Sequence, residues 1–123
     1  MLPYQVYKLV HVLGIALVYS ALGGVLVHVL NGGDKATHRA RGLVAATHGI
    51  GMLLILVGGF GMLARLGLDF GSSPWVHVKL LIWLLLGGAV ALPWRVPALT
   101  KPLWAVAPVL GVIAAAMAVY KPF

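Results

Sequence analysis

Apolar residues dominate four long stretches of the chain, and short segments rich in polar residues or glycine separate them. The stretches run from about 4–30, 42–64, 75–94 and 102–120. Each is close to the roughly 20 residues that an α-helix needs to cross a bilayer. Because backbone polar groups inside a membrane must bond internally, the pattern predicts an all-α fold, an integral membrane antiparallel four-helix bundle.

The connections between these stretches carry helix-stopping residues. Asn31-Gly32-Gly33 follows the first stretch, and a segment with glycine, serine and Pro74 precedes the third. Such residues are typical of turns. The spans and short connections take up the whole length, so we expect residues 1–123 to form a single transmembrane domain.

Composition supports the membrane assignment. The chain is 62% hydrophobic and 9% charged, whereas soluble domains carry roughly 25% charged residues. Nine Lys and Arg residues against two Asp give a net charge of +7. On a soluble protein this charge would suggest nucleic acid. Here the basic residues flank the spans and no basic run with interleaved aromatic residues occurs, so we expect lipid headgroups as partners and no nucleic acid.

The charge distribution also bears on orientation. Four basic residues lie towards the side of the termini, and five lie towards the other side: Lys35, Arg39, Arg41, Arg95 and Lys101. The positive-inside rule therefore favours the second side as cytoplasmic and the termini as non-cytoplasmic.

Residues 42–64 carry no formal charge and hold one histidine, His48. A titratable group inside hydrocarbon is costly and tends to be kept for a function. Several glycines lie beside it, and small residues let a neighbouring helix or a flat cofactor approach the backbone. This stretch is the main sequence clue to function.

The alternating spans place the histidines in two tiers. His11 and His77, with Lys79, lie towards the side of the termini, and His28 and His48 lie towards the other side. Paired imidazoles on facing helices are the ligands of a b-type haem. We therefore expect haem b, with metal ligands among His11, His48, His77 and His28. Cations near the membrane surface would face the propionates: Arg65, Lys79 and Arg41.

A structural interpretation of the same residues stays open. An intramembrane histidine can instead bond a helix carbonyl or, for His48, Thr47. His38 lies among basic loop residues, and we expect it to be solvated. A proton pump is disfavoured because Asp34 and Asp69 both lie in loops. Zinc hydrolysis and copper handling fit less well, because the chain lacks cysteine and a suitable carboxylate.

Short motifs give the chain a family resemblance. They are Tyr4 to His11 with Lys8-Leu9-Val10-His11, His48 followed by Leu53 to Gly59, and Trp75-Val76-His77-Val78-Lys79 with Gly87-Gly88 and Arg95 following. This pattern resembles the SirB family of small four-span membrane proteins. More distantly it is similar to the HemJ protoporphyrinogen oxidases and the CopD membrane domain.

The resemblance to HemJ proteins implies a functional histidine at His11, a functional lysine at Lys79 and b-type haem. The SirB pattern implies Pro-His-x-x-Asp in the second span, whereas this chain has Thr47-His48-Gly49-Ile50-Gly51 and so lacks the carboxylate. The family implies a multi-pass protein of the bacterial inner membrane.

Three functions remain open at this point. The first is a haem b protein that transfers electrons, with a quinone or as a subunit of a redox complex. The second is a cofactor-free accessory subunit that packs against a membrane protein partner or another copy of itself. The third is an enzyme similar to protoporphyrinogen oxidase.

Overall fold

The computed structural model describes residues 2–123, and within that range the regular elements are all helical. The helices are α1 (Tyr4–Leu30), α2 (Arg41–Arg65), α3 (Pro74–Ala89), α4 (Leu92–Arg95), the 3₁₀ helix η1 (Pro97–Leu99) and α5 (Thr100–Tyr120). The bounds of α1, α2 and α5 lie within two residues of the apolar stretches expected from the sequence.

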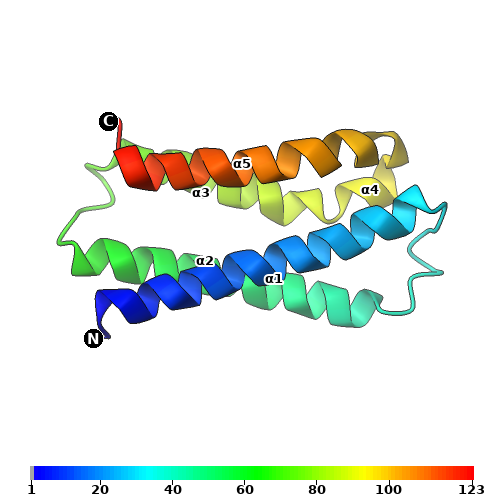
Figure 1. Ribbon diagram of the computed structural model, residues 1–123, viewed down its shortest axis with the longest axis horizontal. Helices are drawn as coiled ribbons and strands as arrows, with labels where there is room; N and C mark the ends of the chain where they lie inside the picture. The colour runs from blue at the N-terminus through cyan, green and yellow to red at the C-terminus, as the bar shows by residue number, and fades with distance from the viewer. Residues whose placement is uncertain (1) are drawn as a thin grey trace.

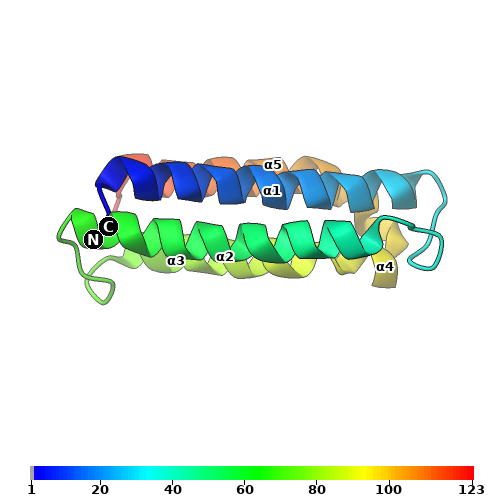
Figure 2. The ribbon, with the colours of Figure 1, turned by 90° about the horizontal axis from the view of Figure 1, so that it is seen from below.

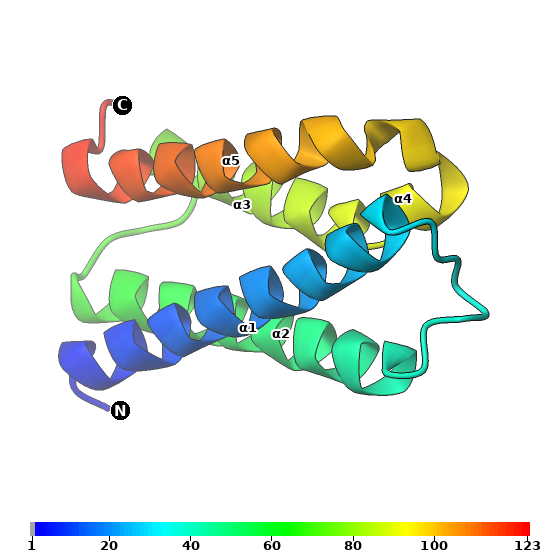
Figure 3. The same cartoon turned by 45° about the vertical axis from the view of Figure 1, so that its right-hand side comes forward.

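The four long helices lie side by side, and successive ones run in alternate directions, so that both termini lie at the same end (Figure 1). Seen from below, α1 and α5 form one layer and α2 and α3 form the other (Figure 2). The oblique view separates an α1/α2 pair from an α3/α5 pair (Figure 3). Three of the helical segments are long and apolar enough to cross a membrane: Tyr4–Leu30, Arg41–Arg65 and Pro97–Tyr120. The molecule therefore has the character of a membrane protein.

Glycines hold α1 and α2 close together. A Cβ atom on Gly51 would lie 2.8 Å from the carbonyl oxygen of Gly14, and one on Gly58 would lie 2.6 Å from the backbone nitrogen of His11. Either distance is shorter than a real contact allows, so the two backbones can touch only because these side chains are absent. Most of the glycine face of α2 therefore serves helix packing.

The third helix is shorter than the 75–94 stretch predicted. It ends at Ala89, and a separate short helix, α4, begins at Leu92. Pro93 explains the break, because it has no N–H to donate to the carbonyl of Ala89 and its ring would clash with that carbonyl. At 16 residues, α3 spans about 24 Å.

The buried core lies where α1, α3 and α5 meet, around Leu22, Ile82, Leu86 and Ala107. Elsewhere the helices present large apolar side chains outward; Val112 and Val119 of α5, for example, are 69% and 72% exposed. Outward apolar faces of this kind match a hydrocarbon solvent.

Candidate functional site: the pocket at His11

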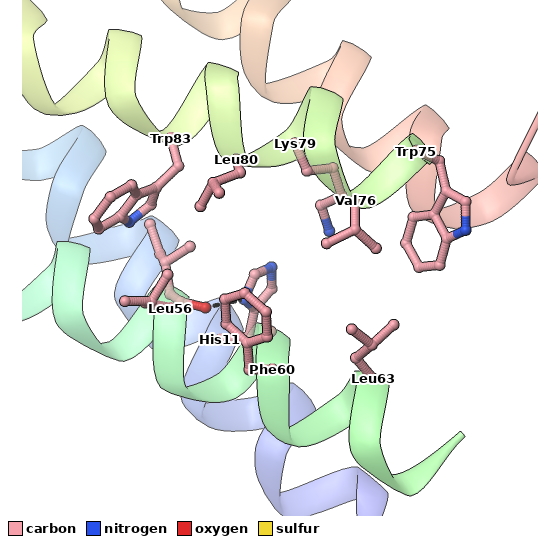
Figure 4. Close-up of a pocket in the computed structure, with 11 residues that line it drawn as sticks. His11, Leu56, Phe60, Leu63, Trp75, Val76, Lys79, Leu80 and Trp83 are labelled. Atoms are coloured by element: carbon pink, nitrogen blue, oxygen red, sulfur yellow. Dashed lines mark hydrogen bonds between the residues drawn. The ribbon is translucent and has the colours of Figure 1, made fainter. Parts of the chain in front are cut away.

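A pocket lies between the two helix pairs, in the half of the molecule that holds the termini. It takes one side chain from α1 and the rest from facing stretches of α2 and α3 (Figure 4). The lining residues are His11, Ile55, Leu56, Gly59, Phe60, Leu63, Trp75, Val76, Lys79, Leu80 and Trp83. Among these described residues, His11 and Lys79 are the titratable ones. The pocket is therefore an apolar, aromatic chamber with two nitrogen-bearing side chains.

The ring of His11 is held by a backbone carbonyl of the neighbouring helix. Its Nδ1 atom lies 2.8 Å from the carbonyl oxygen of Ile55. A carbonyl oxygen only accepts, so Nδ1 must carry the proton and donate it. In the neutral ring, Nε2 then keeps its lone pair, and Figure 4 shows this second nitrogen pointing into the pocket. The arrangement is that of a histidine ready to bind a metal or accept a hydrogen bond.

Lys79 reaches the same pocket from α3. No carboxylate lies among the described lining residues, and the two acidic residues of the chain, Asp34 and Asp69, lie in loops. An ammonium group in an apolar pocket is stabilised by a negative partner. The pocket is therefore suited to a ligand that brings its own anionic group.

The cavity itself is small, at about 80 Å³. A flat macrocycle would need α2 and α3 to move apart. These two helices touch each other sparsely, whereas α1 and α2 are tightly packed.

Trp75 and Trp83 are pocket residues that the sequence interpretation missed. Trp75 is buried, and Trp83 donates its indole N–H to the carbonyl of Met52, 2.9 Å away. Trp75, Lys79 and Trp83 are spaced four residues apart, and residues four apart share one helix face. This spacing could have indicated from the sequence that both tryptophans lie on the same face as Lys79.

His48 lies outside this pocket, buried between α2 and α3. Its Nε2 atom lies 3.3 Å from the carbonyl oxygen of Leu86. Leu86 is one of the last four residues of α3, whose carbonyls have no partner inside the helix. His48 therefore lies within hydrogen-bond distance of a buried carbonyl that has no partner within its own helix, near the point where Pro93 ends that helix. This contact is the structural alternative left open from the sequence.

His28 lies at the opposite end of the molecule, in contact with the 31–40 loop. Its Nε2 atom is shared between the carbonyl of Asp34 at 2.9 Å and the hydroxyl of Thr37 at 3.1 Å. Its ring stacks on His38, with centroids 4.6 Å apart, and Trp94 closes the cluster. The expectation that His38 is solvated was wrong, since its ring is half-buried in this aromatic cluster.

The remaining candidates also lie away from the pocket. His77 is exposed and bonds the carbonyl of Phe70 at 2.9 Å. Arg41 donates to the carbonyl of Lys35 at 3.2 Å, and Arg65 is exposed at the last residue of α2. The structure thus brings His11 and Lys79 together and leaves His28, His48 and His77 apart from them.

Among residues 2–123, no group of three or more His, Cys, Asp or Glu side chains could hold a metal ion. A haem requires fewer protein ligands than such a metal site, because its iron needs only one or two. Comparison with protein-family models, with curated proteins and with solved structures finds no match for this chain.

Proposed function

We propose that this protein is an integral membrane electron-transfer protein that binds a b-type haem at the pocket between α2 and α3, after these two helices have moved apart to admit it, with His11 as the iron ligand. The observation that carries the proposal is the bond from Nδ1 of His11 to the carbonyl of Ile55, which leaves Nε2 as a lone-pair donor facing the pocket. In this proposal α1, α2, α3 and α5 form an antiparallel bundle across the bilayer.

The other lining residues have side chains of a chemical type that suits a haem. Lys79 offers a cation for a propionate, and its place near the start of α3 puts it near the membrane surface. The aromatic rings of Phe60, Trp75 and Trp83 offer flat apolar walls. When bound, a haem supplies one-electron chemistry at its iron. The protein residues hold it, orient it and keep water away.

His11 is the one histidine among the described residues of the pocket. The proposal therefore differs from the paired ligation expected from the sequence. His11 would hold the iron, and the described pocket residues would supply no second histidine ligand. Haem held in this way would bind carbon monoxide when reduced.

The resemblance to SirB and HemJ proteins belongs to the same proposal. It singled out His11 and Lys79, which lie far apart in the sequence. Both residues line the same pocket.

The test is a visible absorption spectrum of the detergent-purified protein with haem added, recorded oxidised, dithionite-reduced, and reduced under carbon monoxide. The proposal predicts a Soret band, a shift on reduction and a further shift with carbon monoxide. The absence of any bound-haem band after haem is added would contradict it.

A cofactor-free accessory subunit is the second candidate, and the exposure of α5 favours it. Only 6% of the apolar window of α5 is buried, so a large face is available to a partner as well as to lipid. This candidate predicts a colourless protein that purifies with a larger membrane complex in fixed stoichiometry. Isolation as a stable monomer that binds haem would count against it.

A further inference from the structure

A second hollow lies between α1 and α5, in the other half of the molecule from the His11 pocket. It is a groove of about 260 Å³ lined by apolar and aromatic residues. The lining residues are Tyr19, Leu22, Gly23, Leu26, Trp104, Ala107 and Pro108. The one hydroxyl among them, on Tyr19, donates to the carbonyl of Ala107 and is thereby satisfied. The groove therefore offers apolar surface and has no free hydroxyl to attract a polar ligand.

Small residues on both helices make the groove hollow. A Cβ atom on Gly23 would have no heavy atom within 4 Å, and Ala107 and Pro108 face it from α5 with short side chains. Helices in a bilayer are solvated by hydrocarbon chains. A groove of this composition at this depth suits an acyl chain.

One cation, Lys101, lies on α5 towards its start, on the same helix stripe as two residues of the groove. Lys101, Trp104 and Pro108 are spaced by three and four residues, so they share one stripe of the helix. Lys101 is exposed in the first turn, and Trp104, which lines the groove, is 53% exposed. From Lys101 to Pro108 the rise along the helix is about 10 Å. Along this stripe, a charged side chain comes first, then an indole ring, then the rest of the apolar groove. A phospholipid has the same order, from its charged headgroup to its acyl chains.

The surrounding end of the molecule is strongly basic. Exposed cations come from the 31–40 loop, the start of α2, α4 and the start of α5, which lie at one end in Figure 1: Lys35, Arg39, Arg41, Arg95 and Lys101. The described acid at this end, Asp34, is engaged by Thr37. Charge complementarity therefore selects an anionic headgroup over a zwitterionic one.

We propose that the groove between α1 and α5 binds one anionic phospholipid, with an acyl chain along Gly23 and Ala107 and the phosphate at Lys101. This site is separate from the haem pocket, and neither proposal depends on the other. It gives the protein a preference for a lipid class, in addition to general solvation by the bilayer.

Native mass spectrometry of the delipidated, detergent-purified protein tests this proposal, with phosphatidylglycerol and phosphatidylcholine of the same acyl chains as probes. The wild-type protein should bind one phosphatidylglycerol about fivefold more tightly than phosphatidylcholine, the preference that one lysine near the surface gives. Lys101→Gln should bring the two affinities close together.

Gly23→Leu should weaken binding of both lipids, because the new side chain fills the groove. Gly49→Leu is the matched control: Gly49 also lies in open space, but on α2, away from the groove, so this variant should bind as the wild type does. Equal affinity of the wild-type protein for both lipids, or unchanged binding by Gly23→Leu, would overturn the proposal.

Discussion

The Nδ1 atom of His11 on α1 lies 2.8 Å from the carbonyl oxygen of Ile55 on α2. This bond joins the two most tightly packed helices and fixes the tautomer of the ring. It also aims the remaining nitrogen at α3, where Lys79 reaches the same pocket (Figure 4). The geometry that holds α1 against α2 therefore also prepares His11 for a ligand.

Replacing Lys79 by methionine should weaken haem binding by about tenfold while leaving the spectrum of bound haem unchanged, because in the proposed site Lys79 would face a propionate and His11 would bind the iron. A tenfold loss equals about 1.4 kcal/mol. Haem titration followed at the Soret band measures it. Haem dimethyl ester, which lacks the propionate charges, should bind the wild type and Lys79→Met alike. Equal loss with haem and with the ester would contradict the assigned partner.

His48→Ala should destabilise the protein and keep the haem. Removing the imidazole leaves the carbonyl of Leu86 without its partner inside an apolar interface, at a cost of about 1–3 kcal/mol. Unfolding in mixed detergent micelles measures the change. A loss of haem with unchanged stability would instead make His48 a ligand.

Gly58→Val should also lower the free energy of unfolding, by about 1–3 kcal/mol, because the new side chain forces α1 away from α2. Gly49→Val serves as the control, since a Cβ atom there meets nothing within 4 Å. The same micelle assay compares the two. Similar stability of both variants would show that the close approach at Gly58 is not needed.

The loop residue Asp34 should give a pH-dependent signal. The backbone N–H of Thr37 donates to its carboxylate at 2.9 Å, and bonds from Thr37 lower the pKa of Asp34 below its ordinary value of 3.8. A lowered pKa means that the loop stabilisation is complete above pH 3.8 and is lost as the pH falls through the lower folded value. The Thr37 amide should therefore lose protection from hydrogen exchange, relative to an unstructured peptide at the same pH, below that value.

Carboxyl ¹³C NMR checks this titration directly. The midpoint of Asp34 should lie below 3.8, and Thr37→Ala should move it part of the way back, since that change removes the hydroxyl and keeps the backbone N–H. A wild-type midpoint at or above 3.8 would contradict the assigned hydrogen bonds.

The length of the apolar stretches predicted the helices well, because in a membrane a long apolar stretch has few alternatives to a helix. The end of α3 was missed, although Pro93 carried the signal. Alternating helix directions predicted that His11 and Lys79 lie in the same half of the molecule, together with His77, and the family resemblance named both residues. That His11 and Lys79 line one pocket was not predicted. The separation of His48 from both could not be read from spacing, because it depends on how far each helix is rotated towards its neighbours. The same rotation brings Trp75 and Trp83 into the pocket.

The most direct test compares haem binding by His11→Ala and His77→Ala, both on the termini side of the molecule and only one in the pocket. Titrating each purified variant with haem and recording the Soret band separates the two roles. We predict that His11→Ala loses the band of the reduced, histidine-bound haem while His77→Ala keeps it. A full Soret band in His11→Ala would contradict the assignment of this pocket as the haem site.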